Sequence, residues 1–147
     1  MIELRNFRTD DTYVLQRNRY NNLSNQEILE LIYSWNEKLY EGKYYEMFAI
    51  VDGQEIVGSI SLYQHTNYII SCGPFIYLEY RQRNYAYHAV NDALHIAKNK
   101  GYKIAVAQIR SDNVASIALH AKLGFEKECT YINNKGNEVH CYLKSLL

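Results

Sequence analysis

The sequence predicts an α/β fold: a mixed, mostly antiparallel sheet of about seven strands with a central parallel pair, flanked by about four helices. Three observations support this prediction. Residues 67–110 show the pattern strand, helix, strand, whose two strands should lie parallel with a right-handed crossover. Hairpin signals stand on both sides of that unit, and 147 residues with 48% hydrophobic side chains suit one core. We therefore expect a single domain over 1–147.

The expected elements follow one another as β-α-α-β-β-β-α-β-α-β-β. Alternating apolar and polar side chains predict the first strand, and a polar turn then begins the first helix. The second helix starts with Ser24 and Glu27 in capping-box spacing and ends at Gly42. Asp52-Gly53 is the strongest hairpin signal in the chain. The expected ranges are, in order, 2–7, 10–20, 23–42, the hairpin 45–64, 67–80, 84–100, 103–109, 111–123, 125–132 and 138–146.

Helical periodicity predicts which residues of two helices are buried. The central helix ends at Gly101, and the apolar run at 103–109 that follows it predicts a fully buried strand. The last two strands flank a turn at 134–137. The predicted buried face of the second helix is Ile28, Leu31, Ile32, Trp35 and Leu39, and that of the central helix is Ala86, Val90, Ala93 and Ala97.

Composition and charge exclude several classes of function. Sixteen basic residues balance sixteen acidic ones, so no net field favours nucleic acid or an anionic membrane as a partner. No apolar run approaches the ~20 residues of a membrane helix, and the N-terminus lacks a signal-peptide pattern, so we expect a cytoplasmic protein. Three cysteines without a CxxC pair indicate neither a disulfide framework nor a zinc site, and we expect no metal.

An anion site is predicted at the start of the central helix, within residues 77–88. A helix start presents unpaired N–H groups and the positive end of the helix dipole. Arg81 and Arg83 add two cations that suit phosphate oxygens. Asn84 tolerates a left-handed conformation, and Ala86 allows a ligand close to the backbone. The segment suits a pyrophosphate, and a solvated basic loop is the alternative.

Gly73 and Pro74 interrupt the strand before this helix. Proline cannot donate to a strand ladder, so the pair predicts a β-bulge where the strand leaves its neighbour. Backbone groups at residues 75–78 would then be free to pair with an extended ligand that carries amides. The alternative is a simple irregularity of an edge strand.

Two polar side chains share one face of the helix that follows residue 112. At about 100° per residue, the seven positions from Asn113 to His120 return to the same face, roughly 10 Å further along the axis. A pair so placed can contact one elongated ligand. The alternative is an N-cap asparagine and a surface histidine without a function.

Taken together, these segments resemble the GCN5-related N-acetyltransferases. The resemblance covers the second half of the chain through "YRQRNYA" and "NVASIALHAKLGF", and the opening "IELRNFRTDD" is similar to that family's first strand and turn. The acyl-CoA loop of the family reads R/Q-x-x-G-x-G/A, and Asn84 stands here in place of the usual glycine. The loop aligns with Arg81, Gln82, Arg83, Asn84, Tyr85 and Ala86, and the second signature with Asn113, Leu123, Gly124 and Phe125.

The resemblance implies a single N-acetyltransferase domain whose central strands splay to admit acetyl-CoA as a cosubstrate. Backbone groups of Ile76 and Leu78 would pair with pantetheine, and Asn113 would also bond the pantetheine arm. The amides of 81–86 would hold the pyrophosphate. His120 stands where the family most often has a tyrosine that protonates the departing thiolate, a feature similar to the phosphinothricin-type acetyltransferases.

The sequence leaves the general base and the acceptor open. His65, at the end of a neighbouring strand, is our candidate base, acting directly or through water. The expected acceptor is a primary amine of a small molecule or peptide, and homodimerisation through a sheet edge stays open. The main alternative function is an acyl-CoA-binding sensor or interaction module without turnover. A nucleotide-binding domain is less well supported, because no glycine-rich fingerprint follows a strand.

Overall fold

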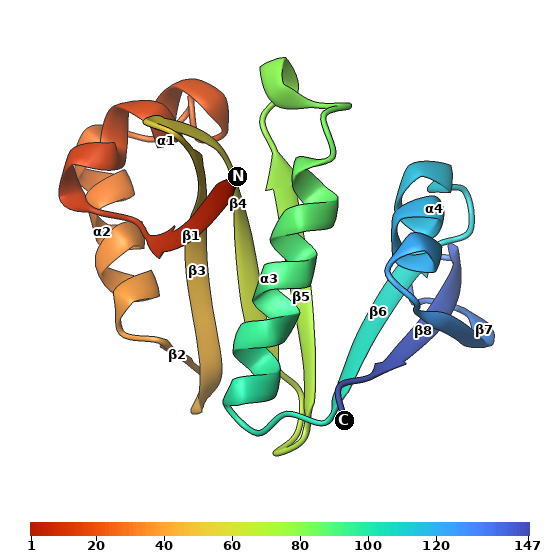
Figure 1. The fold of residues 1–147 in the computed structure, drawn as a ribbon. Helices are drawn as coiled ribbons and strands as arrows, with labels where there is room; N and C mark the ends of the chain where they lie inside the picture. Colours follow the sequence, from red (N-terminus) through yellow and green to blue (C-terminus); the bar gives the residue numbers. More distant parts are fainter.

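An eight-stranded sheet organises the computed structural model, which describes residues 1–147 (Figure 1). Seven strands follow the order β1-β3-β4-β5-β6-β8-β7, and the short β2 pairs only with β3. β5 and β6 are parallel, while all other neighbours are antiparallel, so the predicted mixed sheet is confirmed. The strands are β1 Ile2–Asn6, β2 Leu39–Tyr40, β3 Lys43–Asp52, β4 Glu55–Gln64, β5 Ile69–Ile76, β6 Ile104–Arg110, β7 Glu126–Ile132 and β8 Glu138–Ser145.

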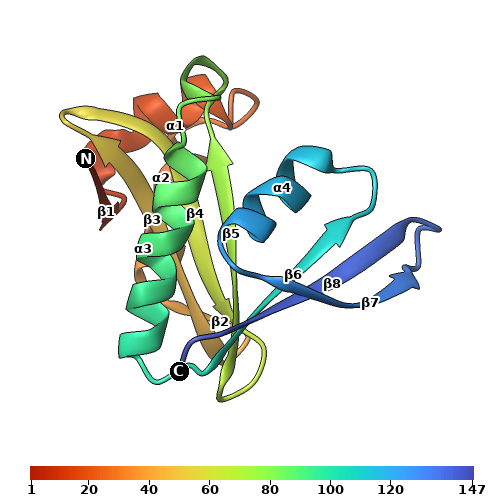
Figure 2. The same ribbon diagram turned by 45° about the vertical axis from the view of Figure 1, so that its right-hand side comes forward.

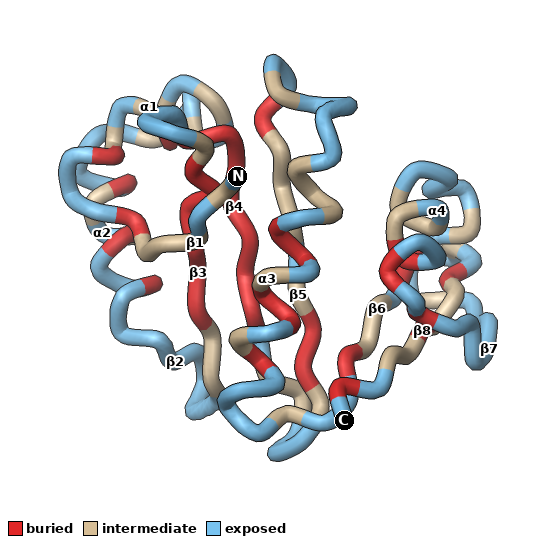
Figure 3. Tube along the Cα trace, in the orientation of Figure 1, coloured by how far each residue is buried: buried red, intermediate tan, exposed pale blue.

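Helices cover both faces of the sheet, and each face has its own apolar core. The helices are α1 Thr12–Asn18, α2 Asn25–Asn36, α3 Tyr85–Asn99 and α4 Val114–Lys122, with short 3₁₀ turns at Thr9–Asp11 and Leu78–Tyr80. α3 packs Val90 and Ala93 with Ile60 of β4 on one face, and α2 packs Ile28 and Ile32 with the opposite face. Buried positions follow β3, β4 and the inner side of α3, whereas β7 is exposed throughout (Figure 3).

The second helix is shorter than predicted. α2 has the expected capping box at Ser24 and Glu27 but ends at Asn36 instead of Gly42. Lys38 has a φ of 61°, a left-handed conformation that breaks the helix, and the next two residues pair with β3 as β2. Leu39 is 61% exposed and was wrongly assigned to the buried face. Pairing with β3 thus overrides the helical periodicity of this segment.

Two predicted strands also differ from those observed. The strand predicted over 67–80 ends at Ile76, where the chain turns into the 3₁₀ segment. The apolar run predicted as a fully buried strand became β6, in which only Ala105 and Ile109 are buried. The reason is that β6 turns away from β5, which leaves most of its side chains partly uncovered.

The sheet parts between β5 and β6, but not through the predicted bulge. β4 and β5 pair without a register shift from Gly58↔Ile76 to Gln64↔Ile70, so the bulge at Gly73-Pro74 was wrong. The parallel ladder is only two pairs long, Ile69↔Ile104 and Ile70↔Ala105. The register shift lies instead in β3, between residues 50 and 51.

Pro74 lies at a position of β5 where a backbone N–H would have no hydrogen-bond partner in a neighbouring strand. The side chain of Arg81 donates from Nε to the carbonyl of Ile76 at 3.0 Å, so that carbonyl faces away from β4. Alternate residues of a strand direct their backbone groups to the same side, and Pro74 therefore also faces away from β4. β6 has already diverged at this level, which makes proline tolerable.

None of the helices combines the length and the apolar character that crossing a bilayer requires.

Gly58 sets the close approach of β4 and β5 beside the parting. A Cβ on Gly58 would lie 2.3 Å from the carbonyl oxygen of Phe75, so one strand would have to shift. We expect Gly58→Ala to lower the free energy of unfolding by about 1–3 kcal/mol in urea denaturation. Glu55→Ala, at the exposed start of the same strand, should change it by less than about 0.5 kcal/mol. Equal stability of the two variants would contradict this role of Gly58.

Candidate active site

A cleft of about 900 Å³ lies where β5 and β6 part. Its walls come from the second half of β5, from β6, from the start of α3 and from α4. Figure 2 shows α4 facing β5 across the angle between the two strands. Binding sites for small molecules typically measure roughly 300–1,000 Å³, so the cleft can hold an extended ligand.

Most of the residues predicted to bind a ligand line this cleft. Leu78, Arg83 and His65 do not. Leu78 is 77% exposed in the 3₁₀ turn, where its carbonyl accepts the N–H of Arg81. Predicted residues that the structure brings to the cleft are Ile76, Arg81, Gln82, Asn84, Tyr85, Ala86, Asn113 and His120.

The loop before α3 adopts the conformation that a glycine would supply. Gln82 and Asn84 both have a φ of 65°, and Asn84 is the left-handed N-cap of α3. The Asn84 side chain makes no capping hydrogen bond, so the first N–H groups of α3 remain available to an anion. Left-handed residues in such a loop also turn backbone N–H groups into an anion-binding concavity. Asn84 in place of glycine is therefore compatible with the loop.

Cations without carboxylate partners surround this loop. Arg81 folds back on β5, and the Arg83 guanidinium lies 5.8 Å from the ring centroid of Tyr80. Lys122, in the last turn of α4, places Nζ 4.6 Å from the ring centroid of Tyr87 on α3. None of the three cations belongs to an ion pair. Sequence reasoning missed Lys122, because no local pattern indicates that α4 ends opposite α3.

Asn113 combines the two roles that its position suggested as alternatives. Its Oδ1 accepts the N–H of Ser116 at 3.1 Å and so caps α4. The side-chain amide keeps two N–H donors that this cap does not use. Because Asn113 lines the cleft, those donors are available to a ligand.

His120 is buried and neutral, and it contributes to the wall of the cleft. It is 5% exposed, and its ring packs edge-on against Phe125 with 4.9 Å between centroids. Nδ1 lies 2.8 Å from the Ser116 carbonyl, which can only accept, so Nδ1 carries the proton and Nε2 a lone pair. Burial lowers the pKa of His120 below its ordinary value, although the bond to Ser116 opposes the shift. The imidazole is therefore neutral at pH 7 and ready to accept a proton.

The sheet face opposite α3 is polar beside the cleft. Ser59, Ser61 and Ser71 are buried on β4 and β5, in positions that sequence reasoning did not assign. The only signal was the alternation of serines with apolar residues in "GSISLY". A second cavity of about 400 Å³ lies beyond them and shares Tyr63 with the cleft. Its other lining residues are Tyr40, Glu41, Lys43, Tyr44, Tyr45, Ser61 and Gln64.

His65 lies at the closed end of the parting. Its Nε2 is 2.6 Å from Oγ of Ser71, whose hydroxyl donates to the carbonyl of Val106 at 2.6 Å. Ser71 thus links β5 to β6 just beyond the last ladder pair. Burial, and then the charge of Lys43, lower the pKa of His65. The structure brings His65 to Ser71 and not to the wall of the cleft.

The cysteines do not supply a nucleophile. All three thiols are free, and burial raises the pKa of Cys72, on the cleft wall, to about 12. A thiol nucleophile acts as the thiolate, which such a pKa disfavours. No three His, Cys, Asp or Glu side chains gather as a metal site would require.

The family model of the acetyltransferase (GNAT) domain matches residues 2–126. The chain belongs to the GNAT acetyltransferase family. Among proteins with curated descriptions, none matches the sequence.

Solved structures share the GNAT fold at low sequence identity. An N-acetyltransferase from Staphylococcus aureus Mu50 is 18% identical over 100% of this chain and 99% of that chain, with a TM-score of 0.75. YncA from Salmonella typhimurium, solved with acetyl-CoA, is 15% identical over 100% and 95%, with a TM-score of 0.74. Mycobacterium smegmatis RimJ, in complex with CoA-disulfide, is 15% identical over 98% and 81%, with a TM-score of 0.81. These likenesses support the fold.

The lowered pKa of His120 makes the stability of this GNAT protein depend on pH. Below about pH 6.5 the unfolded chain binds a proton that the folded state accepts less readily, so stability falls on acidification. We expect urea denaturation to show a smaller free energy of unfolding at about pH 5.5 than at about pH 7.5, and His120→Gln to reduce the difference.

His95→Gln, on the exposed side of α3, is the matched control and should leave the pH dependence in place. Part of the slope should persist in His120→Gln because the pKa of His65 is lowered as well. A slope identical to that of the unsubstituted protein would contradict a neutral, buried His120.

Proposed function

We propose that the protein transfers the acetyl group of acetyl-CoA directly to a primary amine of a small molecule or peptide, as one N-acetyltransferase domain over 1–147. The observation that carries this proposal is a cleft between parting strands with an amide-rich loop and unpaired cations beside it. The same cleft reaches the polar face of the sheet through Tyr63. Membership of the GNAT acetyltransferase family supports the reaction class.

The cleft supplies groups for each part of acetyl-CoA. The pyrophosphate would lie on the amides of residues 81–86, with Arg81, Arg83 and Lys122 as cations. The side-chain amide of Asn113 would donate to a pantetheine carbonyl. The N–H of Ile76, which faces the cleft, would donate to a pantetheine carbonyl in place of the absent strand, since the Ile76 carbonyl already accepts from Arg81. Leu78 is less well placed for this role, because its turn uses its carbonyl.

The backbone of β5 also offers a donor to the thioester oxygen. By the alternation of strand residues, the N–H groups of Cys72 and Ile76 face the side that β6 leaves open. Pro74, between them, has no N–H. A fixed N–H aimed at the carbonyl oxygen stabilises the negative charge that forms when the amine attacks.

We assign His120 the proton transfer that balances the reaction. The C–N bond forms as the C–S bond breaks, so the amine loses one proton and the sulfur gains one. Nε2 of neutral His120 can accept that proton and pass it to the sulfur, whose thiol has an ordinary pKa of about 8.5. His65 is the second candidate base: its Nε2 donates to Ser71, so Nδ1 carries the lone pair, and its lowered pKa keeps it neutral near pH 7.

One observation favours the competing function of an acyl-CoA sensor or interaction module without turnover. No carboxylate lines the cleft, so the two histidines are the remaining candidate bases. Calorimetry with CoA and release of CoA thiol from acetyl-CoA across a panel of amines separate the two functions. Binding with turnover supports the transferase, and binding without turnover of any amine supports the sensor.

Replacement of His120 tests the proton transfer. We expect His120→Gln to lower kcat roughly a hundredfold at saturating substrates, with a small change in KM, because glutamine cannot relay the proton. His140→Gln, on β8 and bonded to Thr130 away from the cleft, is the matched control and should retain kcat. An unchanged kcat in His120→Gln would remove His120 from the mechanism.

Substitutions of Asn84 test whether the backbone of the loop at residues 81–86 binds CoA. Glycine adopts the left-handed conformation without strain, so Asn84→Gly should keep the Kd for CoA within about threefold. Valine disfavours that conformation because of its branched Cβ, so Asn84→Val should weaken CoA binding by about tenfold or more in calorimetry. Equal Kd values for the two variants would show that the backbone of this loop does not hold CoA.

A further inference from the structure

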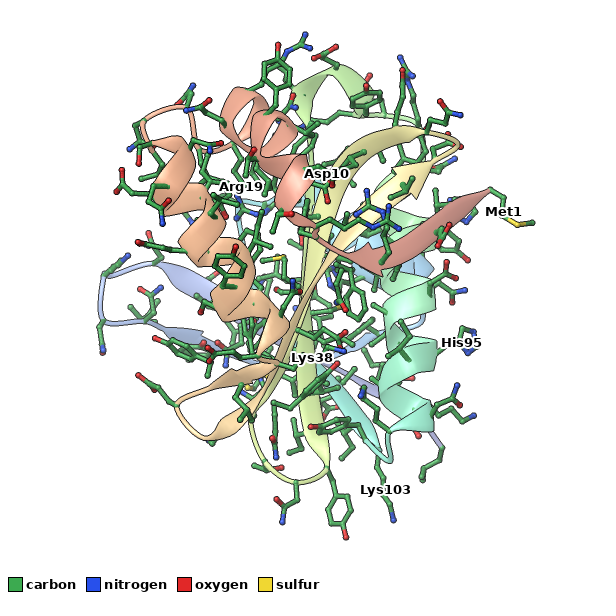
Figure 4. All side chains as sticks on the ribbon, turned by 90° about the vertical axis from the view of Figure 1, so that its left-hand side faces the viewer. Met1, Asp10, Arg19, Lys38, His95 and Lys103 are labelled. Carbon is green, nitrogen blue, oxygen red and sulfur yellow. The ribbon has the colours of Figure 1, made fainter.

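A cation from the end of α1 lies against the cleft wall on the face opposite α3. Arg19 donates from Nη1 to Oγ of Ser59 at 3.1 Å, and its guanidinium carbon lies 4.2 Å from the ring centroid of Phe75. The same carbon is 5.4 Å from the ring centroid of Tyr20. Figure 4 labels Arg19 in the region where α1 and α2 cover the sheet. Because Phe75 lines the cleft, the guanidinium of Arg19 lies beside one of its wall residues.

The positive charge of Arg19 has no counter-charge in the fold. Arg19 belongs to none of the four ion pairs, and its one side-chain hydrogen-bond partner is a neutral hydroxyl. Asp11, buried at the start of α1, is already bound by Arg5 at 2.8 Å and by the N–H of Arg8. Arg19 itself is exposed, so an anion from solvent can reach it.

A second observation concerns a buried hydroxyl on a ring that packs against the same Phe75. Tyr77 is 1% exposed, and its hydroxyl is the one buried side-chain polar atom without a hydrogen-bond partner. Its ring packs edge-on against Phe75 with 6.2 Å between centroids. Burial raises the pKa of Tyr77 and the charge of Arg19 opposes the rise, so the guanidinium lies within electrostatic range of the hydroxyl. A buried hydroxyl without a partner is rare and calls for a partner from outside the chain.

We infer that the acceptor carries a carboxylate, which Arg19 binds as a forked ion pair and to which the hydroxyl of Tyr77 donates. This inference rests on the proposed acetyl transfer and names its acceptor class. A guanidinium matches the two oxygens of a carboxylate, and the ring of Phe75 holds it in place.

The sheet register limits the distance between the carboxylate and the amine. Ser59 of β4 pairs with Phe75 of β5, and the next pair on this face is Ser61 with Gly73. Phe75 and Gly73 both line the cleft. Residues two apart on a strand are separated by about 7 Å. With the thioester at the level of Ser61 and Gly73, the reactive amine would lie within about 7 Å of the carboxylate, as in a short amino acid.

Matched acceptor pairs test the inference. Release of CoA thiol is measured with glycine and glycinamide and with phenylalanine and phenylalaninamide, and aminomethylphosphonate separates a carboxylate from a phosphonate. We expect the protein to use the acids with a kcat/KM at least about tenfold above that of the amides. Arg19→Gln should abolish this preference by raising KM for the acids, with kcat nearly unchanged.

Arg17→Gln is the matched control, a cation of the same helix that is exposed and 3.7 Å from Glu79, and it should keep the preference. Tyr77→Phe should keep the melting temperature, since the hydroxyl has no partner to lose, and raise KM for the acids several-fold. Equal use of acids and amides, a preference for the phosphonate, or an equal loss on both acceptors in Arg19→Gln would overturn the inference. An unchanged KM in Tyr77→Phe would remove the hydroxyl from the site.

A binding measurement keeps this inference separable from the proposed function. If no amine is consumed although CoA binds, the proposed acetyl transfer fails. In that case, with CoA saturating, the acids should raise the melting temperature more than the amides do, and Arg19→Gln should remove the difference. Equal shifts with acids and amides would overturn the Arg19 site alone.

Discussion

The two-pair ladder between β5 and β6 is the constraint on which the rest of the structure depends. Because the strands separate after Ile70, the backbone of β5 keeps groups that no strand satisfies, and the cleft opens beside them. The same separation makes Pro74 tolerable and brings the starts of α3 and α4 to the rim. A sheet zipped along its whole length would have neither the cleft nor the free backbone.

The two faces of the sheet divide the chemistry around that opening. On one side, helix N–H groups and three unpaired cations provide positive potential for phosphates. On the other, buried serines provide neutral hydrogen-bonding groups, and the guanidiniums of Arg19 and Arg81 lie 4.2 and 5.9 Å from the ring centroid of Phe75. Both histidines, His65 and His120, have lowered pKa values, so both are uncharged near pH 7.

The sequence predicted those features that depend on interactions between residues close in the chain. The capping box of α2, the turn at Asp52-Gly53 and the burial of Val90, Ala93 and Ala97 on α3 depend on residues close in sequence, and all were confirmed. Ala86, predicted on the same face, is only half-buried because it lines the cleft. The end of α2, the exposure of β6 and the continuous ladder at Pro74 depend on which strands meet, which periodicity does not report. For the site, the loop and α4 were predictable as contiguous motifs. The sequence could not predict the positions of Lys122, Tyr63 and Arg19 at the site, because each contacts residues that are distant in the chain.

The shortness of the parallel ladder also has a mechanical meaning. β6, β8 and β7 form a continuous antiparallel blade of their own, with seven residue pairs between β6 and β8 alone. Two residue pairs, the Ser71 bridge and the backbone bonds to Tyr68 attach this blade to the rest of the sheet, and its inner side chains share the core under α3. A molecule seated in the cleft touches both halves and substitutes for the ladder that is absent. A ligand bound in the cleft would therefore connect the blade to the rest of the sheet and stabilise the folded domain.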